Sequence, residues 1–293
     1  MFIAGIDGGG THTRIELRDM DNQLIRRGEF GPFNINSIGD HAFRALLKEV
    51  FAWCGNMAEC SRICIGGAGI SNPDTGKILA EELAQNGFIG NWKLCGDQEI
   101  ALRGAMEGPG AVVIAGTGSI CFGKNDAGET ARSGGYGHLI DDGGSGYALG
   151  RAVLGCAVRC VDGRVECSGI LEAVCDRLQG GPERIVPFVY APETDKAAIA
   201  QFAAIALEQA QQGDREAWRI LRQEAEELAQ LVKAVQNRLD MPGCRIALLG
   251  GLLTSENPYR QAVAEALAPI APVVSAEHDA LWGAAQMAWE LTK

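Results

Sequence analysis

The stretch that most constrains the fold is residues 3–17, where an apolar run leads into Asp7, three glycines and Thr11. Beyond this turn, apolar and polar residues alternate over residues 13–17, which is the period-two pattern of a half-buried strand. A dinucleotide-binding glycine loop or a Walker loop would open a helix at this point. The sequence therefore predicts a strand, a tight glycine turn and a second strand.

The residue types in this turn indicate a phosphate ligand. Glycines allow backbone N–H groups to converge on an anion. A carboxylate at the same turn would repel bare phosphate, so Asp7 predicts a bridging divalent metal ion. The structural alternative is that Asp7 is a plain turn residue, because Asp-Gly pairs are common in turns.

The composition is that of an acidic globular protein. The 293 residues, 47% of them hydrophobic, suit about two domains. A net charge of −11 argues against a nucleic-acid or membrane-surface partner. The ten cysteines include no C-x-x-C pair, so we expect reduced, mostly buried thiols. With no signal-peptide pattern and no bilayer-spanning stretch, a cytoplasmic location is expected.

The pattern of the first half starts again near residue 110. Three strands in series are followed by helix, strand, helix, strand and helix, and an apolar strand at 110–115 then leads into a second glycine turn at 116–119. A helical insertion occupies much of residues 147–239. We therefore expect two duplicated mixed α/β domains, residues 1–107 and 108–293.

Three polar residues admit both a functional and a structural interpretation. Asp97 follows an apolar strand and opens a helix, so it is either a helix cap or a general base for a substrate hydroxyl. The field of the helix N-terminus favours its ionised form. Asp142, in a glycine-rich loop, either holds sugar hydroxyls or caps the next helix, and Asn34 is either a loop amide or a ligand hydrogen-bonding group.

An apolar stripe with alternating three- and four-residue steps runs from Trp218 to Leu239. Such a stripe forms the seam of a helical dimer or packs on its own domain, and the second arrangement is the commoner one. A homodimer therefore remains an alternative that the sequence leaves open.

The two glycine turns, the aspartate at a strand end and a third glycine pair, Gly250-Gly251, together resemble the actin-like ATPase superfamily of sugar kinases. Within it, the chain is similar to the N-acetylglucosamine kinase and BadF/BcrA-type ATPase branch, over nearly its whole length. The segments that carry the resemblance are Asp7-Gly-Gly-Gly-Thr11, Gly116-Thr-Gly-Ser119, and Gly134-Gly-Tyr-Gly-His138 followed by Asp142-Gly-Gly-Ser145.

The resemblance implies two ribonuclease H-like domains, each a mixed sheet flanked by helices, with ATP in the cleft between them. It implies that an amino sugar binds on the side of the first domain, that Asp97 is the catalytic base and that Asp7 holds Mg²⁺. The residues that it assigns to ATP are Gly8, Gly9, Gly10, Thr11, Gly116, Thr117, Gly118, Ala200, Gly250 and Gly251. Those that it assigns to the sugar are Asn34, Asp97, Gly135, Tyr136, Gly137 and Asp142.

Two departures from the family pattern concern the identity of the sugar. Tyr136 stands where tryptophan is common, and Gly143 stands where glutamate is common. Glucosamine, N-acetylglucosamine and related cell-wall sugars all fit the sequence.

Two other functions are alternatives to the kinase. The same branch contains ATPases that activate 2-hydroxyacyl-CoA dehydratases through a shared iron–sulfur cluster, and these carry Cys-Ala-Ala-Gly-Thr-Gly where this chain has Val113 at the cysteine position. A sugar-sensing regulator would need a DNA-binding helix pair, which the N-terminal sequence lacks. The kinase is therefore the favoured function, and the activator is the alternative.

Overall fold

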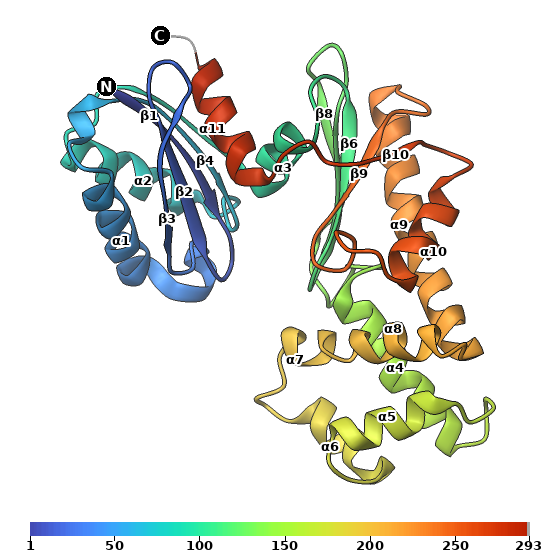
Figure 1. Ribbon diagram of the computed structural model, residues 1–293. Coiled ribbons are helices and arrows are strands. Elements are labelled where there is room, and N and C mark those ends of the chain that lie inside the picture. Colours follow the sequence, from blue (N-terminus) through green and yellow to red (C-terminus); the bar gives the residue numbers. More distant parts are fainter. Residues whose placement is uncertain (292–293) are drawn as a thin grey trace. The chain divides into compact units, whose positions relative to one another are not determined.

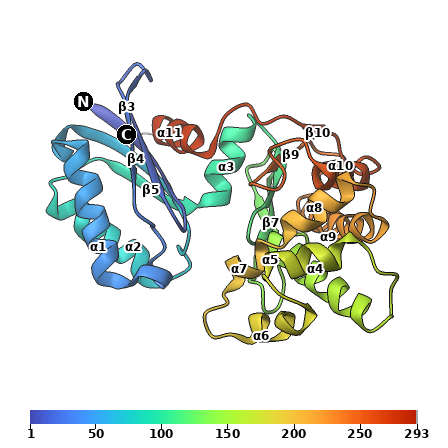
Figure 2. The ribbon, with the colours of Figure 1, turned by 60° about the horizontal axis from the view of Figure 1, so that its bottom comes forward.

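The computed structural model describes residues 1–291 and is shown in Figures 1 and 2. Contacts between residues divide the chain into two units. The first comprises Met1–Glu107 and the segment that starts at Ala276, and the second comprises Gly108–Ser275. Within the described residues, no helix combines the length and the apolar character that crossing a membrane requires.

The sheet of the first unit has the order β3-β2-β1-β4-β5. The central strand β1 pairs antiparallel with β2 and parallel with β4, so Asp7 lies opposite Arg14 on one side and Gly66 on the other. Its strands are β1 (Phe2–Gly8), β2 (Thr13–Arg18), β3 (Leu24–Phe30), β4 (Cys60–Gly67) and β5 (Asn91–Gly96). The carboxyl ends of β1, β4 and β5 therefore meet at one edge, where ligands commonly bind in α/β sheets.

The sheet of the second unit repeats this plan. Its order β8-β7-β6-β9-β10 has the same two antiparallel pairings, followed by the same two parallel ones. The strands are β6 (Gly110–Ala115), β7 (Ser119–Lys124), β8 (Thr130–Gly134), β9 (Ile246–Leu249) and β10 (Val273–Val274). The predicted fold class, two duplicated α/β units with mixed sheets, is confirmed.

Helices cover both faces of the first sheet (Figure 1). One face packs on α1 (Ile35–Cys54) and α2 (Pro73–Gln85), and the other packs on α3 (Asp97–Ala105) and α11 (Ala280–Glu290). Short 3-10 turns lie at Met57–Glu59 and, in the second unit, at Pro182–Arg184. The first helix begins at Ile35, and Gly39 interrupts it with a φ of 78°.

In the second unit, α9 and α10 lie along one face of the sheet, and α4 to α8 gather beyond its end (Figure 1). The apolar stripe of α9 is buried within this unit, where Leu228, Val232 and Val235 join its core, so the predicted packing on its own domain is confirmed. The helices are α4 (Gly146–Val161), α5 (Gly169–Arg177), α6 (Ile185–Tyr190), α7 (Lys196–Ala200), α8 (Ala203–Gln211), α9 (Arg215–Leu239) and α10 (Pro258–Leu267).

The predicted domain division, 1–107 and 108–293, is wrong for the last helix, because α11 packs on the sheet of the first unit. A Cβ at Gly5 of β1 would collide with the backbone of Ala285, so glycine at this position allows the helix to lie directly on the strand. The assignment of residues 280–290 to the second domain was therefore wrong. The contact could not be predicted, because it joins residues 280 positions apart and leaves no local pattern in the sequence.

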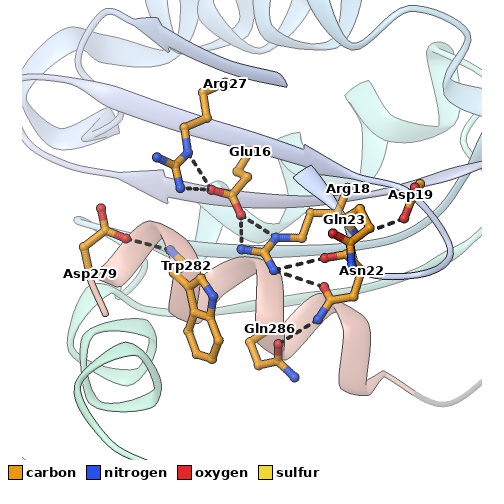
Figure 3. A network of polar contacts seen from close by, with 9 residues as sticks. All are labelled: Glu16, Arg18, Asp19, Asn22, Gln23, Arg27, Asp279, Trp282 and Gln286. Carbon is orange, nitrogen blue, oxygen red and sulfur yellow. Dashed lines mark hydrogen bonds and ion pairs between the residues drawn. The ribbon is translucent and has the colours of Figure 1, made fainter. Parts of the chain in front are cut away.

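A buried polar network also ties α11 to the first sheet (Figure 3). Glu16 is fully buried and accepts hydrogen bonds from Arg18 and from Arg27, whose Nη2 lies 2.6 Å from Glu16 Oε2. Arg18 also donates to Asn22 Oδ1, and Asn22 Nδ2 donates to Gln286 Oε1 of α11 at 3.1 Å. Charge pairing makes burial of this carboxylate tolerable.

Candidate active site

The first glycine turn has a buried start and an exposed tip. Gly8 is the last residue of β1, and a Cβ there would collide with the ring of Phe33, which is itself fully buried. Gly9 donates its N–H to His12 O at 2.9 Å and accepts from Phe33 N at 3.0 Å. Gly10 and Thr11 are exposed, so the part of the turn that a ligand can reach begins after Gly8.

Asp7 is held by an arginine. Arg14 Nη2 lies 2.6 Å from Asp7 Oδ2, and Arg14 Nη1 lies 3.3 Å from Asp279 Oδ2. Burial opposes the charge of the guanidinium, but the hydrogen bond and charge of Asp7 outweigh it and raise the pKa of Arg14. Within residues 1–291 the second oxygen of Asp7 has no hydrogen-bond partner. One free carboxylate oxygen suits Mg²⁺, which usually takes one or two carboxylates together with phosphate and water.

Asp97 lies at the same sheet edge as Asp7. It follows β5 as the first residue of α3, and its Oδ1 accepts a hydrogen bond from Gln98 N at 2.9 Å. Its side chain reaches solvent, yet the surrounding protein partly desolvates the carboxyl group. This desolvation and the negative charge of Asp7 raise the pKa of Asp97, although the Gln98 N–H opposes the rise. A carboxylate with a raised pKa at a sheet edge is a candidate general base.

Asn34 has the structural role that the sequence allows, and its ligand role stays a prediction. It caps α1, with Oδ1 accepting from Asn36 N at 3.1 Å, and the same oxygen lies against Gly69 of the loop after β4. Asn36 and Asn72, which were not predicted as site residues, join the two loops, since Asn72 Nδ2 donates to Asn36 Oδ1 at 2.8 Å. Three asparagine side chains thus lie together where the loop before α1 meets the loop after β4. The close spacing of Asn34 and Asn36 is the one feature of the sequence that could have pointed to this cluster.

The second glycine turn is joined to the start of α4. Gly116 N donates to Gly118 O at 2.9 Å, and Gly146 N donates to Gly116 O at 2.8 Å. Gly250 has a φ of 90°, and a Cβ there would collide with Ala115 O immediately before the turn. A Cβ at Gly146 would lie 3.4 Å from Ala200 Cβ. The structure therefore brings together the predicted nucleotide residues of the second unit, Gly116, Thr117, Gly118, Ala200, Gly250 and Gly251.

The predicted sugar loop of the second unit is open and glycine-rich. Gly135 and Gly137 have φ values of 74° and 94°, which other residues rarely adopt. Tyr136 between them is 59% exposed, and the Arg132 guanidinium lies 4.9 Å from the centre of its ring. The ring is thus exposed, with the guanidinium over one of its faces.

Asp142 lies against the second glycine turn. It has a φ of 64° and is only 4% exposed, and its Oδ2 lies 3.0 Å from where a Cβ of Gly118 would be. Its carboxylate makes no hydrogen bond or ion pair within the described part of the chain. In the structure, Asp142 thus lies against the turn at Gly116–Gly118. The predicted sugar residues Gly135, Tyr136, Gly137 and Asp142 all belong to the second unit, whereas Asn34 and Asp97 belong to the first.

The sequence matches the BadF/BadG/BcrA/BcrD ATPase family over residues 4–288. A curated relative, the N-acetylmuramic acid/N-acetylglucosamine kinase of Clostridium acetobutylicum, is 33% identical over 97% of this chain and 96% of its own. The N-acetyl-D-glucosamine kinase of Dictyostelium discoideum is 29% identical over 82% of this chain and 81% of its own.

A solved structure is also similar over its full length. A Chromobacterium violaceum protein provisionally assigned as an N-acetylglucosamine kinase superimposes with a TM-score of 0.74 at 26% identity, covering 98% of each chain. The fold of both units is therefore shared with a solved structure.

Proposed function

The chain belongs to the BadF/BadG/BcrA/BcrD ATPase family, and we propose that it transfers the γ-phosphoryl group of ATP to a hydroxyl of an amino sugar. N-acetylglucosamine and glucosamine are the favoured substrates, with the N-acetylmuramic acid of the Clostridium relative as a third candidate. Full-length similarity to two curated sugar kinases supports this function. Because ATP is available inside cells, the proposed location is the cytoplasm.

The observation that carries the proposal is the position of Asp97. It stands at the carboxyl edge of the first sheet, directly after β5, which is separated from the strand of Asp7 by β4, and its pKa is raised. A sugar hydroxyl is a weak nucleophile that must lose its proton as the new P–O bond forms. A carboxylate beside the phosphate-binding turn is suited to accept that proton.

The triphosphate is assigned to the N–H groups at the tips of both glycine turns. Gly10 and Thr11 supply the first set, and Thr117 and Gly118 supply the second. Gly9 and Gly116 shape the turns, because their own N–H groups donate to His12 O and Gly118 O. Gly8, whose Cα packs under Phe33, contributes by letting the turn form. The adenosine is assigned to Ala200, Gly250 and Gly251, and the sugar to Asn34, Asp97, Gly135, Tyr136, Gly137 and Asp142.

Mg²⁺ is assigned to the free oxygen of Asp7, where, when bound, it would neutralise charge on the phosphates. The chain's own contribution is mainly positioning, because phosphoryl transfer passes through a loose transition state. Backbone N–H groups of the turns stabilise the equatorial oxygens of the transferred phosphoryl group. Asp97 accepts the proton of the sugar hydroxyl at Oδ2 or Oδ1. Exclusion of water from the site prevents hydrolysis of ATP.

The test is ADP release by the purified protein with N-acetylglucosamine, glucosamine and N-acetylmuramic acid. We expect ADP release that requires one of these sugars, is abolished by a metal chelator and is restored by Mg²⁺ in excess. Glucose serves as the control without an amino group, and the protein is assayed in parallel for iron. Bound iron with ATP hydrolysis that no sugar changes would contradict the kinase function and favour the activator.

A further inference from the structure

The loop that follows Asp142 is held by side chains from three distant elements. Glu224 Oε2 of α9 accepts the N–H of Gly144 at 2.8 Å, and Tyr259 Oη of α10 donates to Gly144 O at 2.6 Å. Ser119 Oγ, at the start of β7, donates to Gly143 O at 2.6 Å. Both polar groups of the Gly144 residue are thus occupied by side chains rather than by neighbouring backbone.

These contacts are shielded from solvent. Tyr259 is fully buried, and burial together with the charge of Glu224 raises the pKa of its hydroxyl. Desolvation also raises the pKa of Glu224, although the Gly144 N–H favours its charged form. A shielded backbone group that loses its partner bears the full cost of desolvation, so each contact constrains the loop strongly.

The constrained loop has an unusual backbone. Asp142 and Gly144 both have positive φ, at 64° and 80°. A Cβ at Gly144 would collide with Leu228 of α9, and one at Gly143 would lie 3.1 Å from Glu227 Cβ. An aspartate in the left-handed region is held there at a cost by its surroundings, and such positions gather at functional sites.

We propose that Glu224 and Tyr259 are positioning residues, which fix the Gly144 peptide and thereby keep the Asp142 carboxylate against the second glycine turn, ready to bind the sugar. The pair touches no substrate atom. It acts on Asp142, whose side chain has no other partner within residues 1–291. This inference rests on the proposed function, because it assigns the pair an effect on sugar binding.

The test compares Glu224→Met, which removes the acceptor, with Glu224→Gln, which retains an amide oxygen at the same place, and with Tyr259→Phe. We expect the KM for the preferred amino sugar to rise about tenfold in Glu224→Met and severalfold in Tyr259→Phe. The Gln variant is expected to stay within about threefold of the wild type. The KM for ATP is expected to change less than the KM for the sugar in all three.

Two variants serve as matched controls. Glu226→Met makes the same substitution on the exposed face of α9, and Tyr190→Phe removes the hydroxyl of a tyrosine that is 82% exposed. Hydrogen exchange at the Gly144 amide gives a readout that needs no substrate, and it should be faster in Glu224→Met than in Glu226→Met.

The outcomes separate this inference from the proposed function. An unchanged sugar KM beside a lowered melting temperature would show that the pair only stabilises the fold and would overturn the inference. A Gln variant as impaired as the Met variant would do the same. If the wild type phosphorylates no amino sugar, the proposed function fails, and unchanged exchange at Gly144 would then separately refute the positioning.

Discussion

Replacing Asp97 by asparagine is expected to lower kcat by roughly 10²–10⁴-fold, the usual contribution of a general base. The amide keeps the size and the hydrogen bond to Gln98 N but cannot accept the hydroxyl proton. Because the folded protein raises the pKa of Asp97, the ionised carboxyl opposes folding at neutral pH, and its stabilising effect appears only as pH falls through that pKa. The asparagine variant should therefore melt no earlier than the wild type.

Steady-state kinetics and a melting curve of the same preparation check this expectation. The control is Asp74→Asn, which changes an exposed carboxylate in the first turn of α2. In the wild type, the acidic limb of kcat should lie at higher pH than an ordinary aspartate would give, because the base must be ionised. Turnover by the asparagine variant near the wild-type value would remove Asp97 from the catalytic role.

Replacing Gly250 by alanine is expected to weaken ATP binding by roughly 10–100-fold and to lower the melting temperature. The left-handed backbone and the collision with Ala115 O each cost of order 1–3 kcal/mol. Since Ala115 immediately precedes Gly116, relief of the collision must displace the turn assigned to the phosphates. The dissociation constant for a non-hydrolysable ATP analogue, measured calorimetrically at a temperature where the variant is folded, gives the effect.

Gly155→Ala is the matched control for that substitution. Gly155 lies within α4 and has no atom within 4 Å of a Cβ position, so alanine there should leave ATP binding unchanged and stabilise the helix slightly. An affinity for the analogue that is the same in Gly250→Ala and the wild type would contradict the assignment of this glycine pair to the nucleotide.

Local patterns in the sequence identified most of the fold. The strand at 110–115 lies where the apolar run predicts it, because the residues of a buried strand are themselves apolar. The repeat of the first half's plan in the second half also follows from local patterns in each half. The packing of α11 on β1 could not be predicted in this way, because it depends on Gly5 meeting Ala285 across the whole chain.

The candidate site divides similarly. The glycine turns and Asp97 have local signals, since their residue types follow a strand directly. Other contacts depend on proximity in three dimensions and leave no local signal. They are the packing of Phe33 on Gly8, the pairing of Arg14 with Asp7 and the contact of Asp142 with Gly118. Glu224 and Tyr259 give no signal in sequence, because a glutamate on a helix and a buried tyrosine are ordinary residues until their partner is known.

The most direct test of the central claim is a crystal structure of the protein with a non-hydrolysable ATP analogue, Mg²⁺ and the preferred amino sugar. We predict that backbone N–H groups from both residues 10–11 and residues 117–118 lie within hydrogen-bonding distance of the phosphates, with a sugar hydroxyl facing Asp97. Phosphates that contact only one of the two glycine turns, or a sugar bound away from Asp97, would contradict it.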